Sequence, residues 1–310
     1  MNIVALAGGV GGAKLAHGLA QILEPEQLTV VVNTGDDFEH LGLHISPDLD
    51  TVMYTLAGIA NPETGWGQAD ETWNFLDALR RLGGETWFRL GDRDLATHVE
   101  RTRRLRVGES LTQVTVALCT ALGVGPLVLP MSDDPVRTMV LTDEGELEFQ
   151  EYFVHRQCGP RVKGFRLEGL ERALPSLSVS AALEVADIIF FCPSNPFVSL
   201  DPILSFPGIR KQIQRKKAVA ISPIVGGQAI KGPAAKMLAE LGLEVSPVSV
   251  AAHYAGLLSG LAIDNVDASL KASIEANGPP VLVTDTLMRA DADRARLARE
   301  VLDFAIRPLP

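Results

Sequence analysis

Four glycines follow the first apolar segment of the chain, in the sequence Gly8-Gly9-Val10-Gly11-Gly12. Residues 2–7 have the pattern of a buried strand, and residues 13–23 have the pattern of a helix. A glycine loop at this junction leaves backbone N–H groups exposed at the positive end of the helix dipole. Glycine also lets a phosphate approach the backbone closely. The sequence therefore predicts a phosphate or nucleotide site at Gly8, Gly9, Gly11 and Gly12.

This loop departs from the two common phosphate-binding fingerprints. Lys14 follows an alanine, so the Gly-Lys-Ser/Thr ending of a P-loop is absent, and it stands where a dinucleotide-binding loop has its third glycine. The alternative is a tight strand-to-helix turn that binds no ligand. A turn alone rarely needs two pairs of glycines, so we favour the ligand-binding interpretation.

Carboxylates gather near the same predicted edge of the sheet. Asp36 and Asp37 follow the apolar strand 28–33, and Asp48 and Asp50 stand a few residues further on. Mg²⁺ prefers oxygen ligands and bridges diphosphates through one or two protein carboxylates, so Asp36, Asp37 and Asp50 are candidate Mg²⁺ ligands. The alternatives are that Asp48 caps a helix and that Asp36 is a turn residue. Asp50 lies past the cap and is the stronger functional candidate.

Two more segments carry polar groups that could bind a ligand. Arg89 stands among aromatic residues in the predicted loop 87–94, where a guanidinium can clamp an anion or stack on a planar ring. The alternative is a surface loop of weak ion pairs. Ser194, Asn195 and Pro196 form a rigid turn after a predicted strand and could recognise a base or ribose, or could be ordinary strand-to-helix punctuation.

Composition limits the classes of partner. The net charge of −10 and the pI near 5.1 argue against a nucleic-acid groove or an anionic membrane surface, so a bound phosphate must be neutralised locally. Three widely spaced cysteines offer neither a disulfide framework nor a CxxC metal site. No apolar stretch is long enough for a membrane span, and we expect a cytoplasmic protein.

Basic residues in two helical stretches are expected to form solvated faces: Arg101, Arg103, Arg104, Arg106, Arg210, Lys211, Arg215, Lys216 and Lys217.

The elements that must position these residues indicate an α/β fold. Apolar strands at 28–33, 127–129, 187–192, 218–221 and 281–284 alternate with helical stretches, which is typical of a mostly parallel, doubly wound, Rossmann-like sheet. Residues 139–153 are expected to form an antiparallel hairpin that turns at 143–145. We expect one domain over residues 1–310. Its Rossmann-like core covers about 1–48 and 123–310, and a helical insertion covers about 49–122, with helices at 51–57, 70–82, 95–105 and 111–122.

Seven segments in this order resemble the 2-phospho-L-lactate transferase family. They are LAGGVGGAKLAHGL, VVNTGDD, ISPDLDTVMYTLAG, GWGQADETW, WFRLGDRDLATHVERT, PSNPFVSL and SPIVGG. The resemblance spans nearly the whole chain, and the segments between Asp48 and Thr102 are the most distinctive.

The resemblance implies an enzyme of coenzyme F-420 biosynthesis. Such an enzyme transfers a phospholactyl-type group from a guanosine diphosphate-linked donor to the deazaflavin Fo, needs Mg²⁺, releases GMP and is usually a homodimer. It also implies that Asp50 and Arg89 hold the deazaflavin. Our mechanistic hypothesis is that Asp50 orients the attacking hydroxyl or accepts its proton. The resemblance further places the glycine loop, Asn33 and residues 194–196 around the guanosine diphosphate part. The donor's arm, lactyl, enolpyruvyl or glyceryl, stays open because these arms differ by only a few atoms.

Two other functions compete with this one. A non-catalytic regulator that binds sugar nucleotides on the same scaffold would keep the glycine loop but would not need the deazaflavin-side segments. A nicotinamide oxidoreductase is disfavoured because the loop lacks its third glycine and the second strand ends in Asn33, where an acidic ribose partner is expected.

Overall fold

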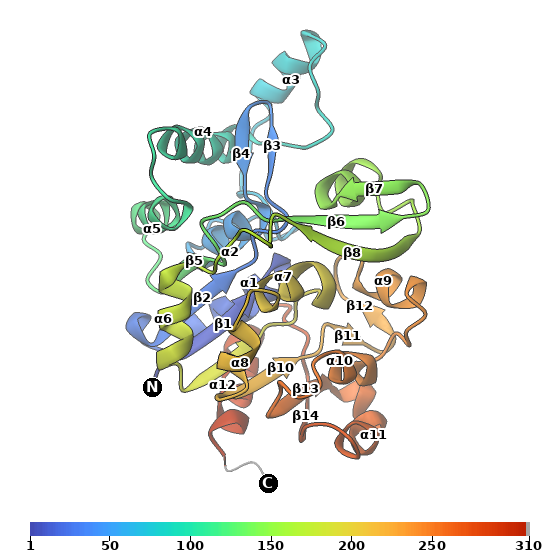
Figure 1. Cartoon of the computed structure of the whole chain (residues 1–310). Coiled ribbons are helices and arrows are strands. Elements are labelled where there is room, and N and C mark those ends of the chain that lie inside the picture. Colours follow the sequence, from blue (N-terminus) through green and yellow to red (C-terminus); the bar gives the residue numbers. More distant parts are fainter. Residues whose placement is uncertain (308–310) are drawn as a thin grey trace.

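Seven strands form the central sheet of the computed structural model, which describes residues 1–307 (Figure 1). They are β1 (Ile3–Ala7), β2 (Leu28–Val32), β5 (Leu127–Pro130), β9 (Ile188–Phe191), β10 (Lys217–Ile221), β13 (Gly260–Asp264) and β14 (Val281–Thr284). All neighbours pair in parallel, in the order β14-β13-β10-β9-β1-β2-β5. This is the order of a Rossmann fold, in which ligands bind where the winding reverses. The reversal lies between β1 and β9.

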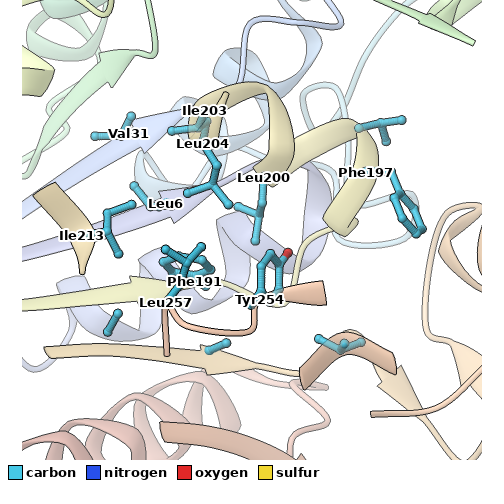
Figure 2. Close-up of a cluster of buried hydrophobic side chains, with 14 of the residues drawn as sticks. Leu6, Val31, Phe191, Phe197, Leu200, Ile203, Leu204, Ile213, Tyr254 and Leu257 are labelled. Atoms are coloured by element: carbon cyan, nitrogen blue, oxygen red, sulfur yellow. The ribbon is translucent and has the colours of Figure 1, made fainter. Parts of the chain in front are cut away.

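The strands are apolar on both faces because helices cover both faces of the sheet. In β1, Val4 and Leu6 pack into one core cluster, and Ile3, Ala5 and Ala7 pack into the other, which is the period of two expected for a strand. Figure 2 shows part of the first cluster, where Leu6, Val31 and Phe191 from adjacent strands meet side chains of the helices above them. Two cores on opposite faces therefore hold the sheet rigid behind the site.

Helices on one face are α1 (Gly9–Ala20), α2 (Pro47–Leu56), α5 (Leu111–Ala121) and α12 (Asp291–Ile306). The other face is covered by α6 (Leu177–Val185), α7 (Asp201–Leu204), α8 (Ile209–Ile213), α9 (Ala234–Glu240), α10 (Pro247–His253) and α11 (Lys271–Glu275). Two helices, α3 (Asn74–Arg81) and α4 (Asp92–Arg106), reach beyond the sheet with the hairpin β3 (Phe38–His40) and β4 (Leu43–Ile45) (Figure 1). Within residues 1–307, no helix combines the length and the apolar character that a bilayer span requires.

A small antiparallel sheet, β7-β6-β8, lies beside the main one (Figure 1). It contains β6 (Arg137–Thr142), β7 (Gly145–Glu148) and β8 (Val162–Glu168). The expected turn between β6 and β7 is present, but the hairpin stops at Glu148, and Glu151–His155 forms a π-helical turn. A tight hairpin joins β11 (Ile224–Val225) to β12 (Gln228–Ala229).

The helix expected at 70–82 is shorter than expected. Asp70 has a left-handed φ of +54°, and α3 begins only at Asn74. The strand β13 was not anticipated, because a short run containing glycine and alanine has no periodicity that separates strand from helix.

Candidate active site

A cavity of about 560 Å³ lies at the point where the winding of the sheet reverses. One part of its wall is polar and is formed by the glycine loop after β1, the turn after β9 and the start of α2. Other parts of the wall are aromatic and contain Trp66, Trp87, Phe88, Phe149 and Phe153. The cavity therefore has a polar end at the glycine loop and flat apolar rings elsewhere in its wall.

The glycines of the loop are required by close packing. A Cβ on Gly11 would lie 2.1 Å from the Pro193 carbonyl oxygen, and a Cβ on Gly12 would lie 2.7 Å from Ser194 Oγ. The Gly8 amide donates to Ser194 Oγ at 3.1 Å, and the Ser194 hydroxyl donates to the Gly8 carbonyl at 2.8 Å. Two of the expected ligand-binding segments thus contact each other at the switch point.

The Asp48 carboxylate lies at the start of α1. Asp48 Oδ1 accepts the Gly9 amide at 2.7 Å, and Gly9 has a φ of +62°. The sequence left Asp48 open between a helix cap and a functional carboxylate, and the structure gives it the anion position at the positive end of a different helix, where the dipole stabilises it. No signal in the spacing of the Pro-Asp-Leu-Asp segment distinguishes these two positions.

Asn33 joins two buried carboxylates. Its amide nitrogen contacts Asp48 Oδ2 at 2.9 Å, the Val198 carbonyl at 3.1 Å and also Asp36 Oδ1, although an amide nitrogen carries only two hydrogens. Burial raises the pKa of Asp48 to about 6, although its hydrogen bonds oppose this shift. Burial, and then the charge of Asp48, raise the pKa of Asp36 well above its ordinary value. Two carboxylates that are hard to ionise together therefore lie at the polar end of the cavity.

Asp37 points elsewhere. Its Oδ2 accepts the Ser46 hydroxyl at 2.7 Å and lies 3.0 Å from His44 Nε2, and the residue is not part of the cavity wall. The structure thus brings Asp36, Asp48 and Asp50 to the wall and leaves Asp37 behind it.

Asp50 is held by an arginine that was expected on a solvated face. Arg101 is 1% exposed, and its guanidinium binds both oxygens of Asp50, with Nη1 to Oδ2 at 3.1 Å. The expectation was wrong because α4 is polar overall and its buried face carries charged residues instead of an apolar stripe. Burial raises the pKa of Asp50, and the charge of Arg101 opposes that effect.

Three more polar side chains lie beside the ion pair of Arg101 and Asp50. His98 Nδ1 lies 3.2 Å from Arg101 Nη1, and His98 Nε2 lies 3.3 Å from Asp94 Oδ2. The Tyr54 hydroxyl donates to Asp94 Oδ1 at 2.7 Å. Sequence reasoning missed this cluster, although spacings of four between Asp50 and Tyr54 and between Asp94 and His98 place each pair on one helix face.

Arg89 lies in the cavity wall as expected, with its guanidinium 4.3 Å from the centre of the Trp73 ring. Lys231 is a second cation in the wall, and its Nζ donates to the Thr64 carbonyl at 2.6 Å. Lys14 is turned away and donates to the Met288 carbonyl at 2.9 Å. The cavity thus has cations at its rim and carboxylates at its floor.

Of the turn after β9, Ser194 and Asn195 line the cavity and Pro196 does not. Asn195 Oδ1 accepts the Phe197 amide at 3.0 Å, so this side chain caps the following turn. Pro196 is buried at the first position of that turn.

The strand order and the cavity at the switch point define a Rossmann-like α/β ligand-binding protein. Its sequence matches the family described as "2-phospho-L-lactate transferase CofD" over residues 3–297. A phosphoenolpyruvate transferase of Kitasatospora aureofaciens is 44% identical, with 96% of this chain and 97% of the relative covered. A 2-phospho-L-lactate transferase of Methanosarcina acetivorans is 40% identical, with 98% of each covered.

A solved structure of a UPF0052 family member from Bacillus halodurans shares the fold. Its TM-score is 0.61 at 15% identity, and the match covers 97% of this chain and 98% of the other. The chain belongs to the 2-phospho-L-lactate transferase CofD family and is an enzyme of that family, a transferase.

Proposed function

We propose that the protein transfers a phosphoenolpyruvyl or 2-phospholactyl group from a guanosine diphosphate-linked donor to the terminal ribityl hydroxyl of the deazaflavin Fo. GMP is the second product, and Mg²⁺ is required. Among the relatives compared, five phosphoenolpyruvate transferases are 42–45% identical and a sixth is 37% identical, whereas two 2-phospho-L-lactate transferases are 40% and 39% identical. The five more similar relatives favour the enolpyruvyl arm.

The observation that supports this proposal is the mixed lining of the cavity. Aromatic rings in the wall offer a surface on which the flat deazaflavin ring can stack, and the N-terminus of α1 with its carboxylates offers a place where a diphosphate can bind. A single cavity of about 560 Å³ at the switch point contains both kinds of group, so donor and acceptor can meet inside it.

The polar end also fits a divalent cation. Asp36 and Asp48 are buried, share one amide donor and have raised pKa values, so together they lack a compensating positive charge. Asp50 differs, because Arg101 already balances it. We therefore assign Asp36 and Asp48 as the first candidates to hold Mg²⁺, with Asp50 beside them. When bound, Mg²⁺ would neutralise the charge of the diphosphate.

In the proposed reaction the ribityl oxygen attacks the phosphorus that carries the donor's acyl arm. A new P–O bond forms to Fo, the P–O bond to the GMP phosphate breaks, and GMP leaves with that electron pair. Asp50 accepts a hydrogen bond from the attacking hydroxyl and takes its proton. Arg89 orients the deazaflavin, and the first amides of α1 bind phosphate oxygens. Positioning and charge neutralisation are the main sources of rate in such transfers.

The test is an incubation of the purified protein with Fo, Mg²⁺ and a mixture of enolpyruvyl-, lactyl- and glyceryl-diphosphoguanosine. Mass spectrometry of the deazaflavin product then identifies the transferred arm. We expect one adduct and an equal amount of GMP, both abolished by EDTA. Nucleotide binding without an adduct, together with no binding of Fo, would instead support the non-catalytic regulator.

A further inference from the structure

The ion pair between Arg101 and Asp50 belongs to a buried cluster that joins two helices. Asp50 and Tyr54 come from α2, whereas Asp94, His98 and Arg101 come from α4. Each of these five side chains is almost fully buried. Removing an arginine from water is costly, so such a residue persists only where its charge and hydrogen bonds are matched.

The contacts match this arginine closely. Its two terminal nitrogens bind the two oxygens of Asp50, and Nη1 also lies 3.2 Å from His98 Nδ1. Because Nδ1 accepts from a guanidinium, the ring carries its hydrogen on Nε2, which faces Asp94 at 3.3 Å. Asp94 in turn accepts the Tyr54 hydroxyl. The guanidinium is therefore held by Asp50 through two contacts and by His98 through a third.

Arg101 does not line the cavity, whereas Asp50 does. A bidentate guanidinium fixes the plane of the carboxylate it binds. Each carboxylate oxygen has a further lone pair, so Asp50 can still accept a hydroxyl from the cavity side. Arg101 is therefore placed to act on a ligand through the lining side chains that it contacts, above all Asp50, which it binds with both terminal nitrogens.

We propose that Arg101 is a positioning residue that fixes the Asp50 carboxylate for its contact with the attacking hydroxyl, with His98 and Asp94 fixing the guanidinium in turn. This inference rests on the proposed function. It separates a catalytic group, Asp50, from a group that determines only its geometry. A simple tie between α2 and α4 is the alternative role.

Two substitutions distinguish these roles. Arg101→Lys keeps the positive charge but loses the two-pronged contact, and Arg101→Ala leaves a space that added guanidinium can fill. Circular dichroism gives the folded fraction of each variant, and kcat is expressed per folded protein. Arg103→Lys is the matched control, because Arg103 is exposed on the same helix and pairs with the exposed Glu100.

We expect kcat of Arg101→Lys to fall about 100-fold, as a misplaced catalytic group implies, while KM for the donor stays close to that of the wild type. Millimolar guanidinium should restore much of the kcat of Arg101→Ala, and urea at the same concentration should not. Arg103→Lys should resemble the wild type.

Wild-type kcat in folded Arg101→Lys would overturn the proposal. So would two variants that both fail to fold, or a loss that guanidinium does not restore, because each result assigns Arg101 a structural role. The wild type is measured first in the same assay. If it makes no deazaflavin adduct, the proposed function itself fails, and this outcome is distinct from any result obtained with the variants.

Discussion

Asp48, Asp50 and Asp94 line the same cavity, and each carboxylate is stabilised in a different way. Asp48 accepts the amide at the start of α1 and an Asn33 hydrogen, Asp50 has a guanidinium, and Asp94 has a histidine and a tyrosine. Only Asp50 is held by a full opposite charge. Burial raises the pKa of Asp50 and the charge of Arg101 opposes that effect, which suits a carboxylate that must accept a proton.

Asp50→Asn tests this difference at the residue scale. The substitution keeps the shape of the side chain but removes its charge, so the attacking hydroxyl loses its proton acceptor. We expect kcat at saturating Fo to fall by about 100- to 10,000-fold, the range for loss of a general base. The free energy of unfolding should also fall by roughly 1–3 kcal/mol, because Arg101 loses a buried charged partner. Steady-state kinetics and urea denaturation measure the two effects.

The matched control is Asp303→Asn, an exposed aspartate near the end of α12. Neither its kcat nor its stability should change. If Asp50→Asn retained full turnover at saturating Fo, the assignment of Asp50 as proton acceptor would be wrong.

Gly11→Ala tests the contact between the two loops at the switch point. The new Cβ would lie 2.1 Å from the Pro193 carbonyl oxygen, so the backbone of one loop must move. Overpacking of this kind costs roughly 1–3 kcal/mol of stability, and the moved loop should raise KM for the donor. Chemical denaturation and donor titration give the two values.

Gly164→Ala is the control for this substitution, because a Cβ there meets nothing closer than Leu141 Cδ1 at 3.6 Å. It should cost far less stability and leave KM unchanged. Equal destabilisation by both variants would count against the role of Gly11 in loop packing.

At this scale, residue types made the glycine loop, Asp50 and Arg89 candidates, and only the resemblance to the transferase family implied that Asp50 and Arg89 hold one ligand. All of them line the same cavity. Residue types could not predict the burial of Arg101 or the position of Asp48. Burial of a charged residue depends on a partner that comes from another helix, and the partner lies 51 positions away in the chain. The spacing of residues within one segment cannot predict a contact between side chains of two helices that are far apart in the chain.

At the scale of elements, the side chain of Asp92, the first residue of α4, stabilises the loop before α3. Asp92 accepts hydrogen bonds from the Thr72 hydroxyl at 2.6 Å and from the Asn74 and Phe75 amides at 3.1 and 3.0 Å. The Thr72 contact, followed by these amide contacts, lowers the pKa of Asp92 to about 2. Asp92 thus caps a helix that belongs to a different part of the sequence.

Asp92→Asn should therefore destabilise the protein in a pH-dependent way. A carboxylate whose pKa falls on folding stabilises the fold above its unfolded pKa, near 3.8, and loses that contribution as the pH falls toward 2. The difference in stability between wild type and variant should be constant above about pH 5 and should shrink below pH 4. Urea denaturation across this range measures it. Asp77→Asn, an exposed change on α3, is the control, and a difference independent of pH would contradict the role of the ionised carboxylate.

Element types were predictable where apolar runs were long or periodic, as in β1, β2 and α12. The errors lie where tertiary contacts decide. The segment 149–155 follows a hairpin in sequence but turns into a π-helix, whose Tyr152 is buried against Lys236, 5.7 Å from the ring centre. The helix expected from residue 70 begins only at Asn74, where Asp92 supplies the cap.

At the scale of the whole molecule, the sheet order determines where the site lies. The alternation of strands and helices predicted a doubly wound sheet, but the switch point depends on which strand lies next to β1. That neighbour, β9, is 181 residues further along the chain from the end of β1, counted from Ala7 to Ile188. The cavity wall is likewise assembled from segments across the chain, from the glycine loop to Lys231.

This assembly predicts that a ligand at the polar end stabilises the entire fold. The chain carries a net charge of −10, so a diphosphate needs local neutralisation, which Mg²⁺ at Asp36 and Asp48 would supply. GDP with Mg²⁺ at about 100 times Kd should add about 2.7 kcal/mol, which corresponds to a rise in Tm of ~4 °C for a chain of this size. EDTA should remove most of the rise, since GDP alone adds negative charge beside the two carboxylates. Asp48→Asn should give a smaller rise than the wild type at equal GDP and Mg²⁺, and Asp303→Asn should match the wild type. An equal rise with ADP would show that the guanine base contributes nothing to binding, and an equal rise in EDTA would reject the proposed metal site.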